Sequence, residues 1–453
     1  MAIDLDKVHI IRKALSFFSW YLSVRLIQRI GAIYHTLTYK ATPSPKNVVV
    51  IGGSFAGVEL VQRLVETLPT GYRVVLVEQR SHLNYLFAFP RFAVVPGHER
   101  KGFIPYDGMF TKAPEGIFKL VRDTALRLTD THVVLASGES IPYAYLAVAT
   151  GSTQPLPVNV SSLERDPGCR ELQFVQESVK LAGSIAVVGA GATGVQLATD
   201  IKSFFPEKEV TLIQSGDRVM DRFGPRLSGY VMDVLQNELK VRVLLNERPN
   251  IPPKDGVLAK MTTLTFSGGR QEKFDLVLTS TGQRPNASIL ATLLPAAISK
   301  ATGRICVLPT MQVTSYQASE TSPGNSAAAP LAPHIFAFGD VAEHGGPMMG
   351  RAGAMQAEVA LQNILAMIKA GNKKKNLATL KLRTYTPDWE VEGFLHLTLG
   401  RTHHLVYAMD TKKGTDLLMG IHNGTDDLDV GKFWKRYGAD VKEVEGPAEG
   451  GEQ

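Results

Sequence analysis

Two glycine-rich turns are the segments of this sequence best suited to chemistry. The first, Gly52–Gly57 (GGSFAG), follows the apolar run 47–51, and the second, Gly189–Gly194 (GAGATG), follows the apolar run 185–188. A segment of helical composition comes after each turn. Glycine lets the backbone approach a pyrophosphate, and the N-terminus of the helix supplies N–H donors to it. The sequence therefore predicts two dinucleotide-binding units, each built as strand, turn, helix and strand.

The first unit ends in an acid. The predicted strand 72–77 runs into Glu78, whose carboxylate is placed to accept hydrogen bonds from a ribose 2′-OH. One position departs from the GxGxxG pattern, because Ser54 replaces the middle glycine. A small hydroxyl side chain can still lie near a phosphate. The candidate residues here are Gly52, Ser54, Gly57 and Glu78.

The second unit lacks the acid. Its strand 209–213 is followed by Gln214, so no carboxylate would repel a 2′-phosphate. Ser215 could donate to such a phosphate and Arg218 could pair with it, which favours NADPH being accepted at least as well as NADH. The alternative is that Arg218 is an ordinary solvated loop residue. The candidate residues are Gly189, Gly191, Gly194, Ser215 and Arg218.

Three further apolar runs end in polar motifs. Segment 145–151 (YLAVATG) has a counterpart in 276–286 (LVLTSTGQRPN), and segment 334–340 (HIFAFGD) ends in Gly-Asp. A carboxylate at the tip of the last strand could bind the ribityl chain of a flavin. These motifs add as candidates Thr150, Gly151, Thr281, Gly282, Gly339 and Asp340.

Length and composition limit the class of protein. A chain of 453 residues is too long for one hydrophobic core and predicts two or three domains. With 44% hydrophobic and 20% charged residues it is neither disordered nor fibrous. Its two cysteines, Cys169 and Cys306, cannot form a disulfide framework, a zinc cluster or a CxxC redox pair. We therefore predict no metal site, and redox chemistry would need a bound cofactor.

The charge is concentrated at the N-terminus. Residues 1–46 hold seven Lys/Arg against two Asp, a balance of +5 within the total of +6. No basic stripe follows in the rest of the chain, which argues against nucleic-acid binding. Residues 7–34 predict a helix with an apolar side and basic residues between, and only eleven uncharged residues separate Lys13 from Arg25. That is short of the roughly 20 residues that span a bilayer. We expect this helix to lie on a membrane surface; a helix docked on the protein and a cleaved organelle presequence are the alternatives.

These motifs, in this order and spacing, resemble the flavoprotein superfamily of pyridine-nucleotide oxidoreductases, and most of all the apoptosis-inducing-factor homologues of the ferroptosis suppressor type. The segment 205–213 (FPEKEVTLI) and the strand that ends at Asp340 carry much of the likeness, which covers roughly residues 47–400. The resemblance implies FAD on the first unit, NAD(P)H on the second, and two-electron reduction of a ubiquinone-like quinone at a membrane.

The resemblance also assigns residues near the flavin. Met355 and Gln356 match the flavin-facing helix of type II NADH dehydrogenases, whose N-terminal dipole would stabilise negative charge on the reduced flavin. Plain core packing is the alternative for that helix. These families often carry Glu where this chain has Gln196, which could form a hydrogen bond but not exchange a proton. No acid or base is predicted, so Gln196 and Gln356 are the only candidates for a catalytic role.

The expected fold is α/β, with two Rossmann-like dinucleotide-binding domains and a small β-rich C-terminal region. The expected divisions are 1–46 (basic helix and linker), 47–155 with 286–375 (split FAD domain), 156–285 (NAD(P)H domain), 376–433 (C-terminal α/β region) and 434–453 (acidic tail).

The expected function is a flavin-dependent NAD(P)H:quinone oxidoreductase. Two alternatives stay open: a flavin oxidoreductase with another small-molecule acceptor in a biosynthetic pathway, and a redox-sensing or death-signalling flavoprotein with little turnover. We expect a peripheral protein on the cytoplasmic side of a membrane, with the mitochondrion as second choice, and a homodimer is possible.

Overall fold

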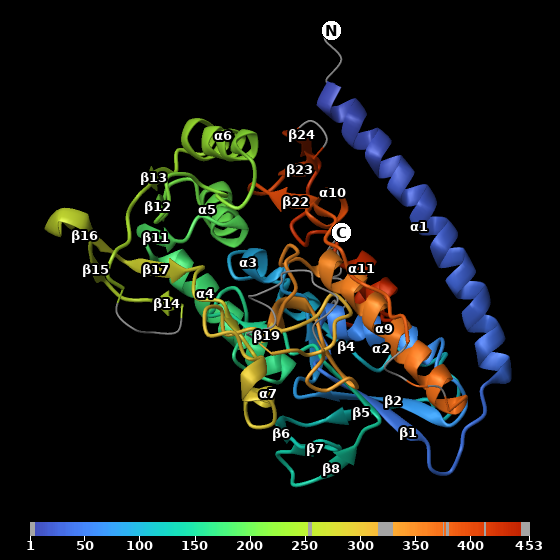
Figure 1. The fold of residues 1–453 in the computed structure, drawn as a ribbon. Helices are drawn as coiled ribbons and strands as arrows, with labels where there is room; N and C mark the ends of the chain where they lie inside the picture. The colour runs from blue at the N-terminus through green and yellow to red at the C-terminus, as the bar shows by residue number, and fades with distance from the viewer. Residues whose placement is uncertain are drawn as a thin grey trace, which may run out of the picture.

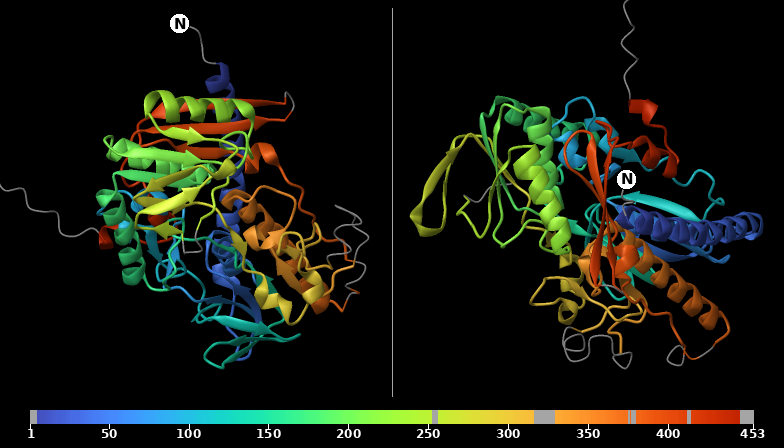
Figure 2. Two further views of the ribbon diagram at one scale, coloured as in Figure 1. Left: turned by 90° about the vertical axis from the view of Figure 1, so that its left-hand side faces the viewer. Right: turned by 90° about the horizontal axis from the view of Figure 1, so that it is seen from above.

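The computed structural model describes residues 5–251, 256–315, 329–374, 376, 380–411 and 414–444. Figure 1 shows two parallel-sheet units, a small antiparallel sheet at the top, and the long helix α1 (Leu5–Thr38) along one side. Figure 2 shows the second unit and α1 on opposite sides of the molecule.

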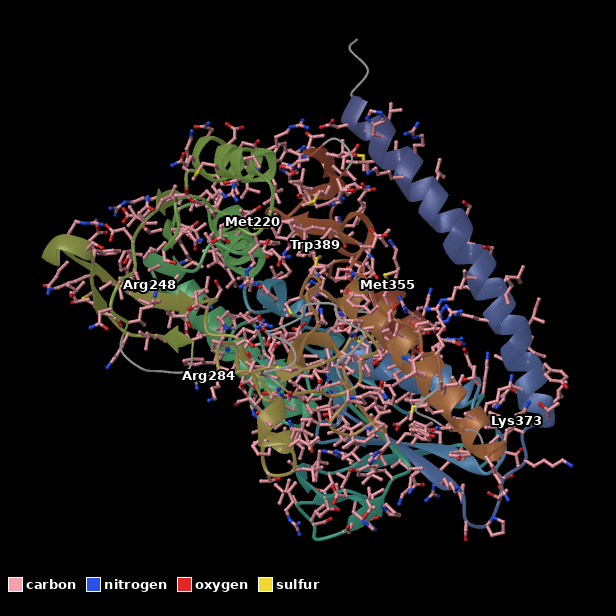
Figure 3. The ribbon with its side chains drawn as sticks, viewed as in Figure 1. Met220, Arg248, Arg284, Met355, Lys373 and Trp389 are labelled. Atoms are coloured by element: carbon pink, nitrogen blue, oxygen red, sulfur yellow. The ribbon has the colours of Figure 1, made fainter. Side chains whose placement is uncertain are left out.

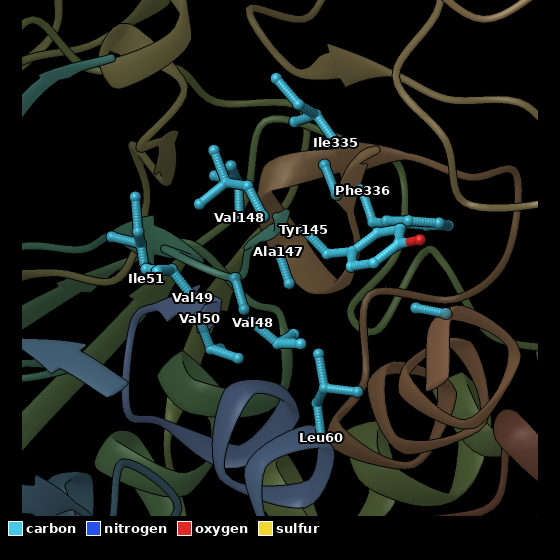
Figure 4. Close-up of a cluster of buried hydrophobic side chains, with 14 of the residues drawn as sticks. Val48, Val49, Val50, Ile51, Leu60, Tyr145, Ala147, Val148, Ile335 and Phe336 are labelled. Carbon is cyan, nitrogen blue, oxygen red and sulfur yellow. The ribbon is translucent and has the colours of Figure 1, made fainter. Parts of the chain in front are cut away.

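The first sheet has the order β20-β9-β1-β2-β5, and every neighbouring pair is parallel. Strand β1 is buried from its second residue onward, as expected for a run of Val and Ile covered on both faces. Helices α2 and α9 pack on the sheet, and Figure 4 shows Val48, Leu60 and Phe336 meeting in its core. The elements are β1 (Lys46–Ile51), β2 (Tyr72–Glu78), β5 (Phe118–Arg122), β9 (Tyr145–Val148), β20 (Ile335–Ala337), α2 (Phe55–Val65) and α9 (Gly350–Asn372).

The second sheet has the order β13-β12-β11-β17-β14, in which only β14 is antiparallel to its neighbour. Helix α5 connects β11 to β12 as a parallel crossover. The elements are β11 (Ser184–Val188), β12 (Glu209–Ile213), β13 (Arg242–Leu244), β14 (Val257–Leu258), β17 (Leu276–Thr279), α4 (Arg165–Leu181), α5 (Ala192–Phe204) and α6 (Pro225–Asp233).

Smaller pairs complete the fold. Strands β10 and β18 pair antiparallel where the chain crosses between the two units. The C-terminal sheet β22-β23-β24 is antiparallel. The remaining elements are β3 (His82–Asn84), β4 (Phe103–Pro105), β6 (Ala125–Leu128), β7 (His132–Leu135), β8 (Ser140–Pro142), β10 (Ser152–Thr153), β15 (Thr262–Thr265), β16 (Gln271–Phe274), β18 (Arg284–Pro285), β19 (Ile305–Cys306), β21 (Ala342–Glu343), β22 (Leu395–Thr398), β23 (His403–Asp410), β24 (Thr415–His422), α3 (Phe89–Phe92), α7 (Ser288–Ala291), α10 (Trp389–Glu392) and α11 (Gly431–Arg436).

The chain is still folded at position 434, so the boundary expected there for an acidic tail is wrong. Trp434 is completely buried and its indole Nε1 donates to the carbonyl oxygen of Lys101 at 2.9 Å. Residues Val441–Val444 then form one turn of 3-10 helix. A buried indole needs apolar neighbours and a hydrogen-bond acceptor, which hold this part of the chain on the protein. Residues 445–453 lie outside the described residues.

Helix α1 (Leu5–Thr38) is longer than the predicted helix 7–34 and has two different sides. On the inner side, Ile10 is buried against the C-terminal sheet, and ion pairs join Lys13 to Glu390 (3.0 Å) and Arg25 to Glu59 (2.8 Å). On the outer side, large apolar residues are exposed at three- and four-residue spacing. Their exposed fractions run from 43% for Ile11 to 80% for Leu37, and the set is Val8, Ile11, Leu15, Leu22, Leu26, Ile30, Ile33 and Leu37. Within the described residues, no helix is both long and apolar enough to cross a bilayer.

One buried ion pair joins three parts of the chain. Arg91 of α3 and Asp200 of α5 lie 2.8 Å apart, and both are almost fully buried. Arg91 also donates to the carbonyl oxygens of Gly400 (2.7 Å) and Thr425 (3.3 Å) in the C-terminal region. Burial raises the pKa of Asp200, and the guanidinium of Arg91 opposes that rise. Removing either partner would leave the other charge buried without compensation.

We expect Arg91→Met to lower the free energy of unfolding by about 3–5 kcal/mol, because Asp200 then loses its counter-charge. The double variant Arg91→Met/Asp200→Leu should recover most of that loss, because apolar residues can replace a buried pair. Urea denaturation followed by circular dichroism measures both. Arg100→Met is the control, since Arg100 pairs with Asp166 on the surface and should cost only about 0–1 kcal/mol. An equal loss of unfolding free energy in Arg91→Met and Arg100→Met would contradict the idea that burial is what makes the Arg91–Asp200 pair costly to break.

Candidate functional site

The first glycine turn is closed by contact between two glycines. Gly52 has φ +104°, and a Cβ on Gly57 would collide with the carbonyl oxygen of Gly52. The turn therefore brings the first turn of α2 directly onto the end of β1. Only glycine fits either position, which gives the glycine spacing of this segment a steric reason.

Ser54 fits the turn in the place of the middle glycine. It is the N-cap of α2 with φ −93° and ψ −167°, an extended conformation open to any residue. Its counterpart Gly191 has nearly the same angles, φ −74° and ψ −176°. Ser54 is exposed, so its hydroxyl faces away from the core. The departure from the glycine pattern thus causes no backbone strain.

Glu78 holds the turn from the tip of β2. Its Oε2 accepts the Gly53 N–H at 2.5 Å, and its Oε1 accepts the Arg80 N–H at 2.8 Å. The hydroxyl of Tyr106 donates to the Gly53 carbonyl oxygen at 2.6 Å. Glu78 is therefore a buried carboxylate beside the glycine turn. Tyr106 and Arg80 were missed in the sequence, because no motif marks them.

The strand-end motifs meet where the chain crosses between the two units. Thr150 Oγ1 donates to the carbonyl oxygen of Asn286 (2.8 Å), and Asn286 Nδ2 donates back to the carbonyl oxygen of Thr150 (2.9 Å). Gln283 Nε2 donates both to Ser152 Oγ (2.7 Å) and to Asp340 Oδ2 (3.0 Å). Gly151 and Asp340, far apart in sequence, are thus parts of one polar group. Ser152, Gln283 and Asn286 were not among the predicted residues.

Asp340 is partly buried, and its carboxylate accepts hydrogen bonds from the side chains of Ser152 and Gln283. Burial raises the pKa of Asp340, while hydrogen bonds from Ser152 and Gln283 and the charge of Arg304 lower it. The preceding Gly339 has φ +71°, and its N–H donates to Gln356 Oε1 at 2.9 Å. That bond ties the Gly-Asp turn to helix α9.

The first turn of helix α9 lies beside this Gly-Asp turn, since a Cβ on Gly353 would stand 3.9 Å from the Cα of Gly339. Gln356 is completely buried, and its Nε2 has no hydrogen-bond partner of good geometry in the described structure. Met355, labelled in Figure 3, is partly buried against the core of the first unit. A Cβ on Gly353 would stand 3.0 Å from Cβ of Ala56 in α2, so the first turns of α2 and α9 lie against each other. Two helix N-termini therefore converge beside Gly339.

The second glycine turn repeats the first with one chemical change. A Cβ on Gly194 would collide with the carbonyl oxygen of Gly189. Gln214 takes the place of Glu78: its Oε1 accepts the Ala190 N–H at 3.1 Å, while its Nε2 donates to Asp221 at 3.1 Å. The strand tip is therefore closed by a neutral amide. Comparing the positions after the two second strands could have identified Gln214 in the sequence.

The other predicted residues of the second unit lie around this turn. Ser215 is exposed, and Arg218 is half-buried, with its guanidinium donating to the carbonyl oxygen of Asp221 at 2.9 Å. Thr281 approaches the turn, because a Cβ on Gly189 would stand 2.6 Å from its methyl group. Gly282 follows with φ +88°. Gln196 points elsewhere: its Nε2 donates to Thr398 of β22 at 2.8 Å. The structure thus places the two glutamine candidates, Gln196 and Gln356, in different hydrogen-bonded groups.

A group of four aromatic rings, hereafter the aromatic group, lies beside the first turn. It joins Phe55, which follows Ser54, to Tyr85 and Phe87 and to Phe433 of α11, with ring centroids 4.5–5.9 Å apart. Phe87 is 52% exposed, and its ring lies 3.6 Å from the Cβ position of Gly350, the first residue of α9. No sequence motif predicts this group, because its members come from three separate segments.

The two turns have the donors and acceptors that dinucleotides need. Each has a helix N-terminus behind glycine backbone, an exposed position (Ser54 or Gly191) open to a phosphate, and a polar group at the tip of the second strand. The unpartnered Nε2 of Gln356 adds a buried donor where the two helices converge. These residues fit FAD on the first unit and a nicotinamide dinucleotide on the second.

Comparison with known proteins agrees with this geometry. The family model described as pyridine nucleotide-disulphide oxidoreductase matches residues 46–363. The chain is 31% identical over 421 residues to Fe-regulated protein 8 of Mycosarcoma maydis, covering 88% of this chain and 96% of that protein. It is 25% identical to ferroptosis suppressor protein 1 of Xenopus tropicalis, covering 86% and 96%. The solved structure of the sulfide:quinone oxidoreductase of Aquifex aeolicus shares the fold, with a TM-score of 0.63, 15% identity, and 88% and 91% coverage.

The α/β fold with two Rossmann-type units and the expected family are therefore confirmed. FAD and NAD(P)H are the cofactors of this fold and sequence family, as the two turns indicated. The chain belongs to the pyridine nucleotide-disulphide oxidoreductase family, among the relatives of ferroptosis suppressor protein 1 and the apoptosis-inducing-factor homologues, and is an NAD(P)H-dependent flavin oxidoreductase.

Proposed function

We propose that this protein is a flavin-dependent NAD(P)H:quinone oxidoreductase that works at a membrane surface. When bound, FAD accepts a hydride from NAD(P)H and passes two electrons to an acceptor, and the protein supplies binding, orientation and charge. The two cysteines are buried and form no disulfide with each other, so reduction through a protein dithiol is not part of this proposal.

In this proposal the first unit, 47–155 with 286–375, holds FAD. The N-terminus of α2 with Gly52, Ser54 and Gly57 would bind the pyrophosphate, and Glu78 the ribose, by exchanging its bond to Gly53 for ribose hydroxyls. Asp340, already oriented by Ser152 and Gln283, would hold the ribityl chain. The start of α9, with Met355 and Gln356, would direct positive dipole at the flavin ring. Thr150, Gly151 and Gly339 would shape the backbone around it.

The second unit, 156–285, would bind NAD(P)H. Gly189, Gly191 and Gly194 would admit the pyrophosphate at the N-terminus of α5. Thr281 and Gly282 would lie beside the nicotinamide half. Because Gln214 is neutral where Glu78 is charged, a 2′-phosphate near Ser215 and Arg218 would meet an amide at the strand tip; the Asp221 carboxylate accepts from that amide at 3.1 Å.

The aromatic group is the observation that carries the quinone assignment. It lies between the first glycine turn and the start of α9, where the flavin ring would be, and Phe87 opens it to solvent. Flat apolar rings are bound well by offset or edge-on aromatic side chains. A quinone head between Phe87 and the flavin would therefore be bound by stacking without an ionic partner.

The outer side of α1 supports the membrane part of the proposal. Its exposed apolar residues recur from Val8 to Leu15 and again from Leu22 to Leu37, and Arg12 and Arg29 are exposed beside them. An apolar side flanked by basic residues is typical of helices that lie in the lipid headgroup region. The inner side of α1 is docked on the rest of the protein. In this proposal α1 therefore stays on the protein while its outer side contacts the membrane. A cytoplasmic face is our first choice of location, and the mitochondrion the second.

Stopped-flow measurement of flavin absorbance tests the reaction and the aromatic group together. NAD(P)H should bleach the protein without oxygen, and a short-chain ubiquinone should restore the colour. Phe87→Ala should raise KM for the quinone about 2- to 12-fold, equivalent to 0.5–1.5 kcal/mol of aromatic contact, with bleaching unchanged. Phe174→Ala, an equally exposed Phe on α4, is the control. Bleaching without recovery would reject quinone as acceptor and favour another small molecule or a redox-sensing role.

The choice of nucleotide depends on Arg218. We expect Arg218→Ala to raise KM for NADPH about tenfold, because a charge-assisted contact to the 2′-phosphate is lost. KM for NADH serves as the internal control and should change little. Steady-state rates with both nucleotides measure the ratio. Equal increases in KM for NADH and NADPH would show that Arg218 affects nucleotide binding only through the conformation of its loop.

The membrane proposal predicts the effect of charges on the outer side of α1. Leu22→Glu/Leu26→Glu/Ile30→Glu should reduce flotation with anionic liposomes at least tenfold, because each buried Leu or Ile contributes about 1.5–3 kcal/mol. Leu181→Glu, on an exposed apolar residue of α4, should float as the unchanged protein does. Flotation of the triple variant equal to that of the unchanged protein would exclude membrane contact through this stripe.

A further inference from the structure

The loop between β12 and α6 ends on the C-terminal sheet. This β12–α6 loop consists of residues 214–223 and includes Arg218. Phe223, its last residue, packs edge-on against Tyr407 of β23, with ring centroids 5.4 Å apart and an interplanar angle of 83°. The Gly224 N–H then donates to the Tyr407 hydroxyl at 3.4 Å. The loop is therefore attached to a sheet that belongs to neither dinucleotide unit.

Asp416 of β24 holds the start of α6. Its side chain is buried, and its carboxylate accepts the Arg226 N–H and the Tyr407 O–H, both at 3.1 Å. A helix N-terminus favours an anion, because its first N–H groups have no partners within the helix. A Cβ on Gly224 would overlap the Asp416 carboxylate. Gly224 has φ −68°, so glycine is required here for close approach and not for its backbone angles.

The β12–α6 loop is also tied to the second glycine turn. The Met220 N–H donates to the carbonyl oxygen of Ala190 at 2.9 Å, and the Phe223 N–H donates to the carbonyl oxygen of Met220 at 2.9 Å. Met220, labelled in Figure 3, is buried and has φ +52°, a left-handed conformation that residues other than glycine seldom adopt. Such a conformation persists where the surrounding structure enforces it. The loop is thus fixed between Ala190 and Asp416.

Arg218 lies within this fixed stretch of chain. Its guanidinium donates to the carbonyl oxygen of Asp221 at 2.9 Å, so its direction depends on the backbone of the loop. The Asp221 carboxylate in turn accepts from Gln214 at the tip of β12. A guanidinium binds a phosphate best when it is already directed at it, because less conformational freedom is then lost on binding.

We propose that Asp416 and Tyr407 are positioning residues for the nicotinamide nucleotide, which hold the β12–α6 loop so that Arg218 is directed at the 2′-phosphate of NADPH. Neither residue touches the nucleotide, and both act through the start of α6. The selectivity for NADPH thus depends on the C-terminal sheet as well as on the second unit. The inference rests on the part of the proposed function that places NAD(P)H on the second unit.

Stopped-flow reduction of the full-length, FAD-loaded protein tests this, with NADPH or NADH and without oxygen or acceptor. The bleaching rate at increasing nucleotide concentration gives a dissociation constant and a limiting rate. Gly224→Ala, whose Cβ would push α6 away from Asp416, should raise the dissociation constant of NADPH about 3- to 10-fold, at most the loss expected for removing Arg218 itself. NADH should be weakened less, and the limiting rate should not change, because the hydride leaves from the other end of the nucleotide.

Two further variants and one control complete the test. Asp416→Asn should act in the same direction, because it presents an N–H donor in place of one of two acceptor oxygens that both receive hydrogen bonds. In an Arg218→Ala background, Gly224→Ala should weaken NADPH little further, since variants that act through one contact are not additive. Gly229→Ala in the same helix is the control, because a Cβ there would meet no atom within 4 Å.

Three results would overturn the proposal: unchanged dissociation constants in Gly224→Ala and Asp416→Asn, equal weakening of NADPH and NADH, or an equal loss in Gly229→Ala. Thermal melting and FAD content identify a variant that has merely failed to fold, and the other variant then decides. Because the measurement uses no acceptor, a failure of quinone reduction appears only when quinone is added and is distinguishable from a failure of this proposal.

Discussion

The pairing of Arg91 with Asp200 is the constraint on which the arrangement of the three parts depends. Removing one partner of a buried ion pair leaves an uncompensated charge, so α3 and α5 must meet where Arg91 reaches Asp200, and the hydrogen bonds of Arg91 to Gly400 and Thr425 bring the C-terminal region to the same place. Helix α5 carries the second glycine turn at its N-terminus, and α3 follows the chain that contributes Tyr85 and Phe87. The ion pair thus sets where the second turn lies relative to the aromatic group.

The two dinucleotide turns show how little chemistry the chain itself must supply. Both use a glycine contact, a helix N-terminus and a polar side chain that accepts the N–H of the turn. They differ mainly in that side chain, a carboxylate at Glu78 and an amide at Gln214. Gln214 differs from Glu78 in having an amide nitrogen in place of one carboxylate oxygen, so the second strand tip carries no charge of its own.

The C-terminal region contributes more to this site than its weak family likeness indicates. Phe433 completes the aromatic group, Glu392 and Tyr385 lie behind α9, and Thr398 holds Gln196. Helix α1 docks on the same region through Ile10 and Lys13. The docked side of α1 and the residues behind α9 are therefore connected through α10, which carries both Glu390 and Glu392.

The sequence alone determined the two glycine turns, their strands and helices, the acid Glu78 and the strand tip at Asp340, because these depend on local rules. Glycine turns, runs of apolar residues and the helices that follow the turns can each be recognised from a few neighbouring positions. The tertiary structure decided the rest. The Arg91–Asp200 pair, the aromatic group and the docking of the inner side of α1 each join segments that are far apart in the sequence. The buried Trp434 likewise extended the folded chain past the expected start of the tail. No local sequence pattern identifies these residues, because their contacts form only when the chain folds.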